Sequence, residues 1–249
     1  MIDILSLESY CNELLSVAEF SDYCPNGLQV EASADVGRLM VGVSACQGLI
    51  EAAEAWDADV LLVHHGYFWK GEAQALRGIK ANRVGALFRQ QTSLLAYHLP
   101  LDAHAEYGNN RQLGECLGLI PATPSADHGL IWETRLSETM APQDLAHRIA
   151  DRLGRAPTHI APDGRPISRV GWCSGAAQDY IEEAAELGLD AYISGEISEQ
   201  TVHLARELGV HYYAAGHHAT ERYGVQALGS HLAEKFSLEY RFVEVENPV

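Results

Sequence analysis

The chain has 249 residues, 47% of them hydrophobic, so it can bury one large core or two cores of ordinary domain size. It carries 17 Lys and Arg against 34 Asp and Glu, and the formal net charge of -17 makes non-specific binding to nucleic acid unfavourable. Its five scattered cysteines are typical of reduced thiols in a cytoplasmic protein, and we expect neither a signal peptide nor a membrane-spanning segment.

The first half of the chain alternates predicted helices with predicted strands. The first helix has Ser6 as its expected N-cap, and residues 25–27 (Pro-Asn-Gly) have the composition of a turn. This alternation is typical of an α/β fold with a largely parallel sheet. Helices are predicted at residues 5–15, 46–58 and 82–91, strands at 38–45, 60–63 and 93–99, and a loop at 100–110.

The second half repeats part of the first. VGVSACQGLIEAAEAWDADVLLVHHG, residues 41–66, aligns with VGWCSGAAQDYIEEAAELGLDAYISGE, residues 170–196. Chance similarity between two helices rich in Ala and Glu is the alternative, but the matching flanks favour a duplication. In this alignment Val41 lies over Val170, and after a two-residue insertion His64 and His65 lie over Gly195 and Glu196.

We therefore predict an α/β fold built from two similar α/β domains that arose by internal duplication. The best linker candidate is PATPSADHG, residues 121–129. The predicted domains are residues 1–124 and residues 125–249, and the C-terminal segment is a candidate to pack back on the first domain.

Polar side chains follow three predicted strands. In open α/β sheets, ligands bind outside the carboxyl ends of the strands, so two such halves would bring these clusters face to face across a cleft. The clusters are His64 and His65, then His98, Asp102 and His104, and then His217, His218 and Glu221.

The spacing of these residues suits a metal site. In a helix that begins near His217, Glu221 lies one turn further on the same face. Both His64 and His65 could bind if the strand ends there and turns at Gly66. Imidazole and carboxylate donors suit zinc, iron, manganese or nickel, and Asp102 could bind one ion or bridge two. The alternative is a set of hydrogen-bonded structural histidines.

Four further residues are expected around this site. Glu196 ends the strand equivalent to that of His65, so we predict that it lies near the ions without binding them and acts as an acid or base. A helix-capping or salt-bridging glutamate is the alternative, because SGEISEQ opens a predicted helix. His98, His218 and Tyr67 are expected around the pocket, and for Tyr67 core or interface packing is an equal alternative.

Five motifs occur in one order: SDYCPNGLQVE, VHHGYFWKG, HLPLDAHAEYGNN, SGEISEQ and YAAGHHATERYG. Together they resemble the Nif-three-like family, whose members are catalogued as GTP cyclohydrolase 1 type 2 homologs, and the short bacterial branch is the most similar. The resemblance implies two α/β domains around a dinuclear metal centre, and a toroidal homohexamer. The ligands that it implies are His64, His65, Asp102, His217 and Glu221.

The function that we predict is a metal-dependent hydrolase with two divalent ions per chain. Its substrate would be a nucleotide or another phosphorylated small molecule. The alternative is a non-catalytic metal-binding scaffold, or a factor for metal insertion or trafficking. The two functions would share the same ligands, and an acid or base beside the ions would favour the enzyme.

Overall fold

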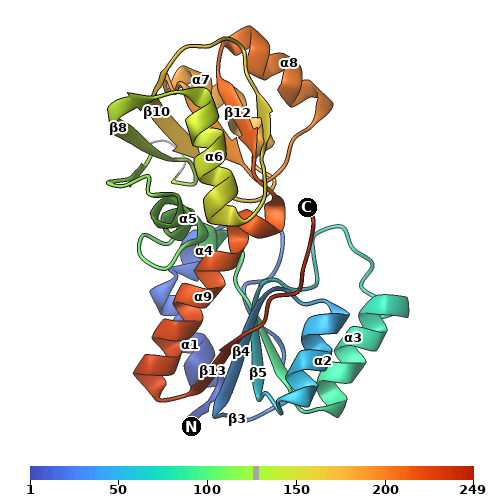
Figure 1. Ribbon diagram of the computed structural model, residues 1–249. Helices are drawn as coiled ribbons and strands as arrows, with labels where there is room; N and C mark the ends of the chain where they lie inside the picture. The colour runs from blue at the N-terminus through green and yellow to red at the C-terminus, as the bar shows by residue number, and fades with distance from the viewer. Residues whose placement is uncertain (126–128) are drawn as a thin grey trace. The chain divides into compact units, whose positions relative to one another are not determined.

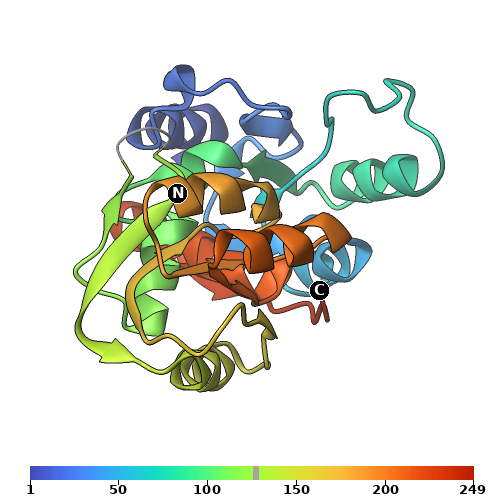
Figure 2. The same ribbon diagram turned by 90° about the horizontal axis from the view of Figure 1, so that it is seen from above.

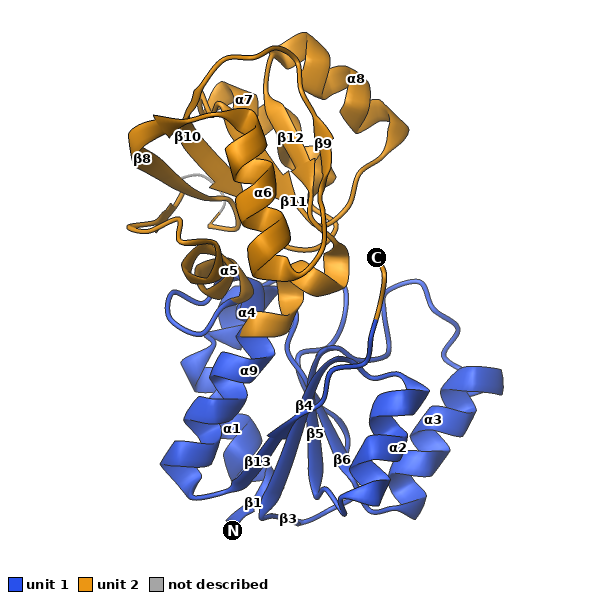
Figure 3. Ribbon diagram, in the orientation of Figure 1, with its two compact units in different colours: residues 1–108, 224–246 blue, residues 109–223, 247–249 orange. Residues whose placement is uncertain are grey.

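The structure is a computed structural model that describes residues 1–125 and 129–249, and the chain forms two compact units (Figure 1). Unit 1 comprises residues 1–108 and 224–246, and unit 2 comprises residues 109–223 and 247–249 (Figure 3). Each unit has its own sheet and its own buried core, so each is a mixed α/β structure as predicted.

Unit 1 is built on a five-stranded sheet in the order β13-β4-β5-β6-β2. The first four strands run parallel, and β2 pairs antiparallel with β6 at the edge. Two short strands, β1 and β3, pair separately. The strands are β1 (Ile2–Asp3), β2 (Gly27–Val30), β3 (Asp35–Val36), β4 (Arg38–Ser44), β5 (Val60–His65), β6 (Ser93–Ala96) and β13 (Glu239–Phe242).

Helices cover both faces of this sheet because its strands are apolar on both sides. Leu39 and Val41 of β4 pack with α1 and with the part of α9 that belongs to unit 1, whereas Met40 between them packs with α2 and α3 on the other face. The long connection at residues 66–77 joins β5 to α3 (Figure 2). The helices are α1 (Ile4–Leu14), α2 (Gln47–Ala55), α3 (Gly78–Arg89), α4 (Leu99–Ala103) and α9 (His217–Phe236), with a 3-10 turn at Val17–Glu19.

Unit 2 has a six-stranded sheet in the order β7-β8-β10-β11-β12-β9. Strands β10, β11 and β12 run parallel, and α5 and α6 cover one face of the sheet while α7 and α8 cover the other. The elements are α5 (Asn109–Leu117), β7 (Thr123–Pro124), β8 (Trp132–Met140), α6 (Pro142–Leu153), β9 (Thr158–Ile160), β10 (Ile167–Trp172), a 3-10 turn (Gln178–Tyr180), α7 (Ile181–Glu186), β11 (Ala191–Ser194), α8 (Glu199–Leu208) and β12 (His211–Ala214).

The same pair of hydrogen bonds occurs near the start of β4 in unit 1 and of β10 in unit 2. In unit 1, Asp59 Oδ2 accepts the backbone N–H of Arg38 at 2.7 Å, and the Arg38 guanidinium donates to the Trp56 carbonyl at 2.9 Å. In unit 2, Asp190 Oδ2 accepts the N–H of Arg169 at 2.8 Å, and the Arg169 guanidinium donates to the Leu187 carbonyl at 2.6 Å. Both sheets also contain three adjacent parallel strands followed by an antiparallel edge strand, and together these repetitions support the internal duplication.

The repeated pair of hydrogen bonds corrects the sequence alignment. Arg38 and Asp59 are 21 residues apart, and so are Arg169 and Asp190, so no insertion separates them. Leu39 therefore corresponds to Val170, and the expected pairing of Val41 with Val170 is two residues out of register. Counting six residues from each aspartate still places Glu196 at the position of His65.

Several elements differ from their predicted bounds. α1 begins at Ile4, and its N-cap is Asp3, whose carboxylate accepts the N–H of Ser6 at 2.9 Å, so Ser6 is not the cap. The predicted loop at 100–110 contains most of α4 and the start of α5. In the predicted linker, residues 126–128 lie outside the described residues, while Thr123 and Pro124 pair with β8.

The boundaries between the two units also differ from the predicted boundary between residues 124 and 125. α5 belongs to unit 2 because Leu113 and Leu117 pack in its core beside Trp172. β13 belongs to unit 1 because it pairs with β4, with Glu239 opposite Arg38. Among the described residues, no helix has both the length and the apolar composition needed to cross a bilayer.

We predict that Asp190→Asn lowers the free energy of unfolding by about 1.5–3 kcal/mol at pH 7, because a charged acceptor of two part-buried backbone N–H groups is lost. Burial would raise the pKa of Asp190, but hydrogen bonds from Arg169 and Ser168 outweigh it and hold the pKa below its usual value. The contribution is therefore present above about pH 4 and is lost as the pH falls through the folded-state pKa. Urea unfolding at pH 7 and pH 3 checks this.

The control for this prediction is Glu182→Gln, which changes an exposed acid of the same unit. Its stability should stay close to that of the unchanged chain at both pH values. Equal stabilities of Asp190→Asn and the unchanged chain at pH 7 would contradict the role of this carboxylate.

Candidate metal-binding site

The carboxyl end of β5 presents His64 and His65 side by side. His64 is fully buried, His65 is half-buried, and their ring centroids lie 4.5 Å apart. β5 includes both residues, so the strand ends after them. The next residue is Gly66, where a side chain would be crowded. A Cβ at this position would lie 2.2 Å from Gln29 Oε1 and 2.7 Å from Ala96 Cβ.

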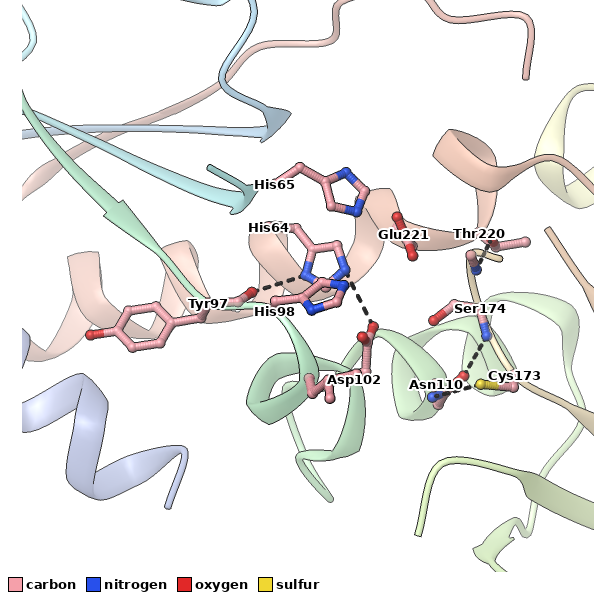
Figure 4. A network of polar contacts seen from close by, with 12 residues as sticks. His64, His65, Tyr97, His98, Asp102, Asn110, Cys173, Ser174, Thr220 and Glu221 are labelled. Carbon is pink, nitrogen blue, oxygen red and sulfur yellow. Dashed lines mark hydrogen bonds and ion pairs between the residues drawn. The ribbon is translucent and has the colours of Figure 1, made fainter. Parts of the chain in front are cut away.

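Hydrogen bonds orient both rings through Nδ1. His64 Nδ1 lies 2.9 Å from the backbone carbonyl of Tyr97, which can only accept, so this nitrogen carries the proton of the neutral ring (Figure 4). His65 Nδ1 lies 3.1 Å from the Ser44 hydroxyl. Nε2 is therefore the nitrogen through which each ring could bind an ion, an orientation that is usual for metal-binding histidines.

A short helix after β6 brings a carboxylate to this pair. Asp102 lies in α4, where its N–H bonds to the carbonyl of His98, and its side chain is buried. Its Oδ1 lies 3.5 Å from His64 Nε2 (Figure 4). A carboxylate and an imidazole nitrogen at this separation can share a cation.

His98 joins the two histidines of β5 in unit 1. Its Nδ1 lies 2.9 Å from Asp22 Oδ1, and its ring centroid lies 5.0 Å from that of His64. Two groups of unit 1 have ligand atoms within 4.8 Å of one another and could hold a metal ion, and they share His98. The groups are His64, His65 and His98, and Asp22, Cys24 and His98.

In unit 2, α9 begins at His217 and places Glu221 one turn further, as the spacing predicts. His217 Nε2 lies 3.0 Å from Glu221 Oε2, and His217 Nδ1 lies 2.6 Å from Glu196 Oε1. The ring is thus held between two carboxylates, one at each nitrogen. The position between His217 Nε2 and Glu221 is suited to a cation.

The pKa of His217 reflects these two carboxylates. Burial would lower the pKa of the imidazole, but the hydrogen bonds and charges of Glu221 and Glu196 outweigh burial and raise it to about 9. The ring is therefore protonated at neutral pH when no metal is bound. A metal ion that binds Nε2 has to displace this proton.

Glu196 does not cap the helix that follows it. The N-cap of α8 is Ser198, which forms a capping box with Thr201. The Glu196 carboxylate instead lies 2.6 Å from Nδ1 of His217, so the capping alternative is wrong, and the acid or base role of Glu196 stays a prediction. A carboxylate on the other nitrogen of a metal-binding imidazole is a common device that fixes the ring and raises its basicity.

The other expected pocket residues have different surroundings. Tyr67 is a core residue of unit 1, and its hydroxyl donates to the Ala45 carbonyl at 2.7 Å. His218 is buried in unit 2, and its backbone N–H donates to the Val249 carbonyl at 3.0 Å. Within unit 2, the described residues form no metal-capable group that includes His218.

Two glycines make room for the ligands of unit 2. At Gly175 a Cβ would lie 2.0 Å from Glu221 Oε1 and 3.3 Å from His217 Nε2. At Gly195 a Cβ would lie 2.6 Å from the Cα of His217, which explains why a glycine occupies the position of His64. The donor types fit a divalent ion, and so does the cradle, which is the space that Gly175 and Gly195 leave beside His217 and Glu221.

Sequence reasoning missed Asp22 and Ser44, which orient histidines. Asp22 is 76 residues from His98, and Ser44 is 21 residues from His65, so no local spacing links the partners. Asp22 lies in SDYCPNG, which has the composition of a turn. The only local signal was the position of Ser44 at the end of a predicted strand beside that of His65.

Comparisons with known proteins agree over the whole chain. The profile of the Duf34/NIF3 family (NGG1p interacting factor 3) matches residues 2–248. A protein of Allochromatium vinosum named GTP cyclohydrolase 1 type 2 homolog is 54% identical over 249 residues, which cover 100% of this chain and 98% of that protein.

Two solved structures cover 100% of this chain and 100% of their own chains. The structure described as protein ybgI, of unknown function, has a TM-score of 0.96 and 45% sequence identity. The protein TTHA1606 from Thermus thermophilus has a TM-score of 0.91 and 32% identity. Each match therefore includes both units.

We predict that Gly175→Ala lowers the zinc affinity of the protein by about 10–100-fold, because the added Cβ displaces the carboxylate of Glu221. The far-ultraviolet circular dichroism spectrum should stay unchanged. Competition with a chromophoric chelator measures the affinity.

Gly118→Ala is the matched control. Gly118 has φ +67, close to the +66 of Gly175, but nothing lies within 4 Å of its Cβ position. Backbone strain is therefore the same in the two variants, and only Gly175→Ala crowds a ligand. Equal zinc affinities of the two variants would contradict the role of the cradle.

Proposed function

This chain belongs to the Duf34/NIF3 family, and on that premise we propose that it is a metal-dependent hydrolase with a dinuclear divalent-metal centre. Its substrate class is a nucleotide or another phosphorylated small molecule. The observation that carries the proposal is the common orientation of the histidines at the strand ends. His64, His65 and His217 are each held through Nδ1, which leaves Nε2 as the ligand nitrogen.

The proposed centre draws ligands from both units. A tetrahedral ion takes four ligands, and each unit by itself supplies fewer, so neither unit completes an ion site with this set. Five donors are more than one such ion needs, which supports two ions. The proposed ligands are His64, His65 and Asp102 from unit 1, and His217 and Glu221 from unit 2.

The donor types restrict the metal. Three imidazoles with two carboxylates suit zinc, iron, manganese or nickel better than magnesium or calcium, which prefer oxygen donors throughout. Glu196 holds the imidazole of His217 in position, and Gly175 leaves room for the carboxylate of Glu221. We place Glu196 beside the ions as a positioning residue.

Hydrolysis is the reaction that this arrangement supports best. When bound, two such ions would activate water and stabilise negative charge that develops on the substrate. The chain itself orients the ligand rings and buries His64, Asp102 and Glu221 away from bulk water. The printed name of the relative, GTP cyclohydrolase 1 type 2 homolog, supports a nucleotide as the substrate class.

We predict that protein reconstituted with zinc, manganese, iron or nickel binds about two ions per chain at the dinuclear centre. With one of these metals it should hydrolyse a member of a panel of nucleotides and phosphoesters. Glu221→Ala should lose metal and lower the rate more than about 100-fold, because a direct ligand is removed. Glu182→Ala, at an exposed position of the same unit, should retain both properties. Elemental analysis and product assays measure the two quantities.

Two results would overturn this proposal in different ways. Less than half an ion per chain after reconstitution would refute the metal centre. Two ions without turnover on any member of the panel would refute the hydrolase and favour a metal-binding scaffold or a factor for metal insertion or trafficking.

We also propose that the protein assembles as a homohexamer. The family resemblance motivates this, and exposed apolar side chains on and before α3 support an interface there. Leu76, Ile79 and Phe88 are 47%, 69% and 55% exposed. Large exposed apolar side chains are a feature of association surfaces.

We predict a molar mass near six times the 27.2 kDa of one chain by light scattering. The double variant Ile79→Asp, Phe88→Asp should reduce that mass, because charges would then replace the apolar contacts. A monomeric mass of the unchanged protein at micromolar concentration would contradict the assembly.

A further inference from the structure

We propose that unit 1 contains a separate cation site with a sulfur ligand, formed by Asp22, Cys24 and His98, which binds zinc or another thiophilic divalent ion. None of the three belongs to the five proposed ligands of the dinuclear centre. One ligand atom from each lies within 4.8 Å of the other two. The site does not depend on the hydrolase function, because it needs no residue of unit 2.

Hydrogen bonds hold Asp22 and His98 in place before any ion binds. Asp22 Oδ1 lies 2.9 Å from His98 Nδ1, while Oδ2 accepts the N–H of Leu99 at 3.0 Å and the side-chain amide of Asn26 at 2.9 Å. The Asn26 side-chain oxygen in turn accepts the N–H of His98 at 2.7 Å. The loop that carries Asp22 and Cys24 is thus tied to the end of β6, so binding orders little further chain.

The donors define the kind of ion. A thiolate, an imidazole and a carboxylate form a mixed set that zinc accepts, whereas hard ions such as magnesium and calcium avoid sulfur. All three side chains are largely shielded from solvent: Asp22 is 3% exposed and His98 is 11% exposed, and Cys24 is buried. A bound cation would neutralise the buried carboxylate and the thiolate that forms when Cys24 loses its proton.

Ion binding at this site needs no further reactant, because every proton that moves is accounted for. The Cys24 thiol releases one proton to solvent and becomes a thiolate ligand. The proton on His98 Nδ1 moves to Nε2, and the hydrogen bond between Nδ1 and Asp22 Oδ1 is replaced by bonds from both atoms to the ion. The net change is one divalent ion bound and one proton released.

His98 also belongs to the group that contains His64 and His65. The sulfur-containing site therefore lies next to the principal histidines and shares one residue with their surroundings. An ion held by Asp22, Cys24 and His98 would lie within reach of the neighbouring imidazoles. This arrangement suits a position where an ion is held before or beside those of the dinuclear centre.

A structural alternative explains the same contacts. The pair of Asp22 and His98 could serve only to tie the loop to β6, with Cys24 as a buried thiol that packs against it. The two explanations agree on every contact of the metal-free protein. They differ in one observable, which is a bond between sulfur and metal.

Cobalt(II) provides that observable. The five proposed ligands of the dinuclear centre contain only nitrogen and oxygen, so they cannot give a thiolate-to-cobalt charge-transfer band. We expect this near-ultraviolet band when cobalt(II) is added to reduced, metal-free full-length protein. It should disappear in Cys24→Ser, where at least a tenfold loss of cobalt affinity at one position and one fewer zinc ion per chain are also expected.

Two control variants test whether the thiolate-to-cobalt band comes from Cys24. It should persist in Cys46→Ser, which removes a half-buried thiol of the same unit, and in Glu221→Ala, which impairs the proposed dinuclear centre alone. Bound cobalt without a thiolate band in the unchanged protein would overturn the site, whatever the folding of the variants. A band that survives in Cys24→Ser would overturn it as well. Loss of turnover in Glu221→Ala bears only on the hydrolase, so the two proposals fail separately.

Discussion

Hydrogen bonds at Nδ1 determine what the histidines of this protein can do. An imidazole has one proton to share between two nitrogens, and the partner at Nδ1 decides which nitrogen is presented to a cation. The chain uses different partners for the same purpose at the three proposed ligand histidines, and each partner lies at or just after a strand end. The pairs are His64 with the Tyr97 carbonyl, His65 with the Ser44 hydroxyl, and His217 with Glu196.

The two sheets supply the frame for these contacts, and the two units share one arrangement at the amino ends of their parallel strands. At the amino ends of the parallel strands, Asp59 and Asp190 make the same bonds in both units. At the carboxyl ends the residues differ, because unit 1 has His65 where unit 2 has Glu196. Stability therefore depends on the shared geometry at one end, which leaves the residues at the other end free to change.

Much of this organisation could be predicted from the sequence. Strands β4 to β6 and the helix that places Glu221 one turn after His217 follow from local periodicity, because apolar spacing reports which face is buried. The partner of His98 could not be predicted, since Asp22 reaches it only after the loop and β6 have come together. The unit boundaries were missed for the same reason, because tertiary packing and not composition assigns α5 to its core.

Unit 1 is discontinuous in sequence, and this has a consequence for biosynthesis. Its sheet is completed by β13 and its core by Val225, Leu228 and Leu232 of α9, all from the last part of the chain. During translation the first 108 residues cannot complete unit 1 until α9 and β13 have been synthesised. Until then one edge of β4 is unpaired and one face of the sheet is only partly covered by helices. Unit 2, in contrast, emerges with nearly all of its residues. Unit 2 is thus able to fold first, although it is second in the sequence, and exposed apolar surface on the nascent first segment is a natural target for chaperones.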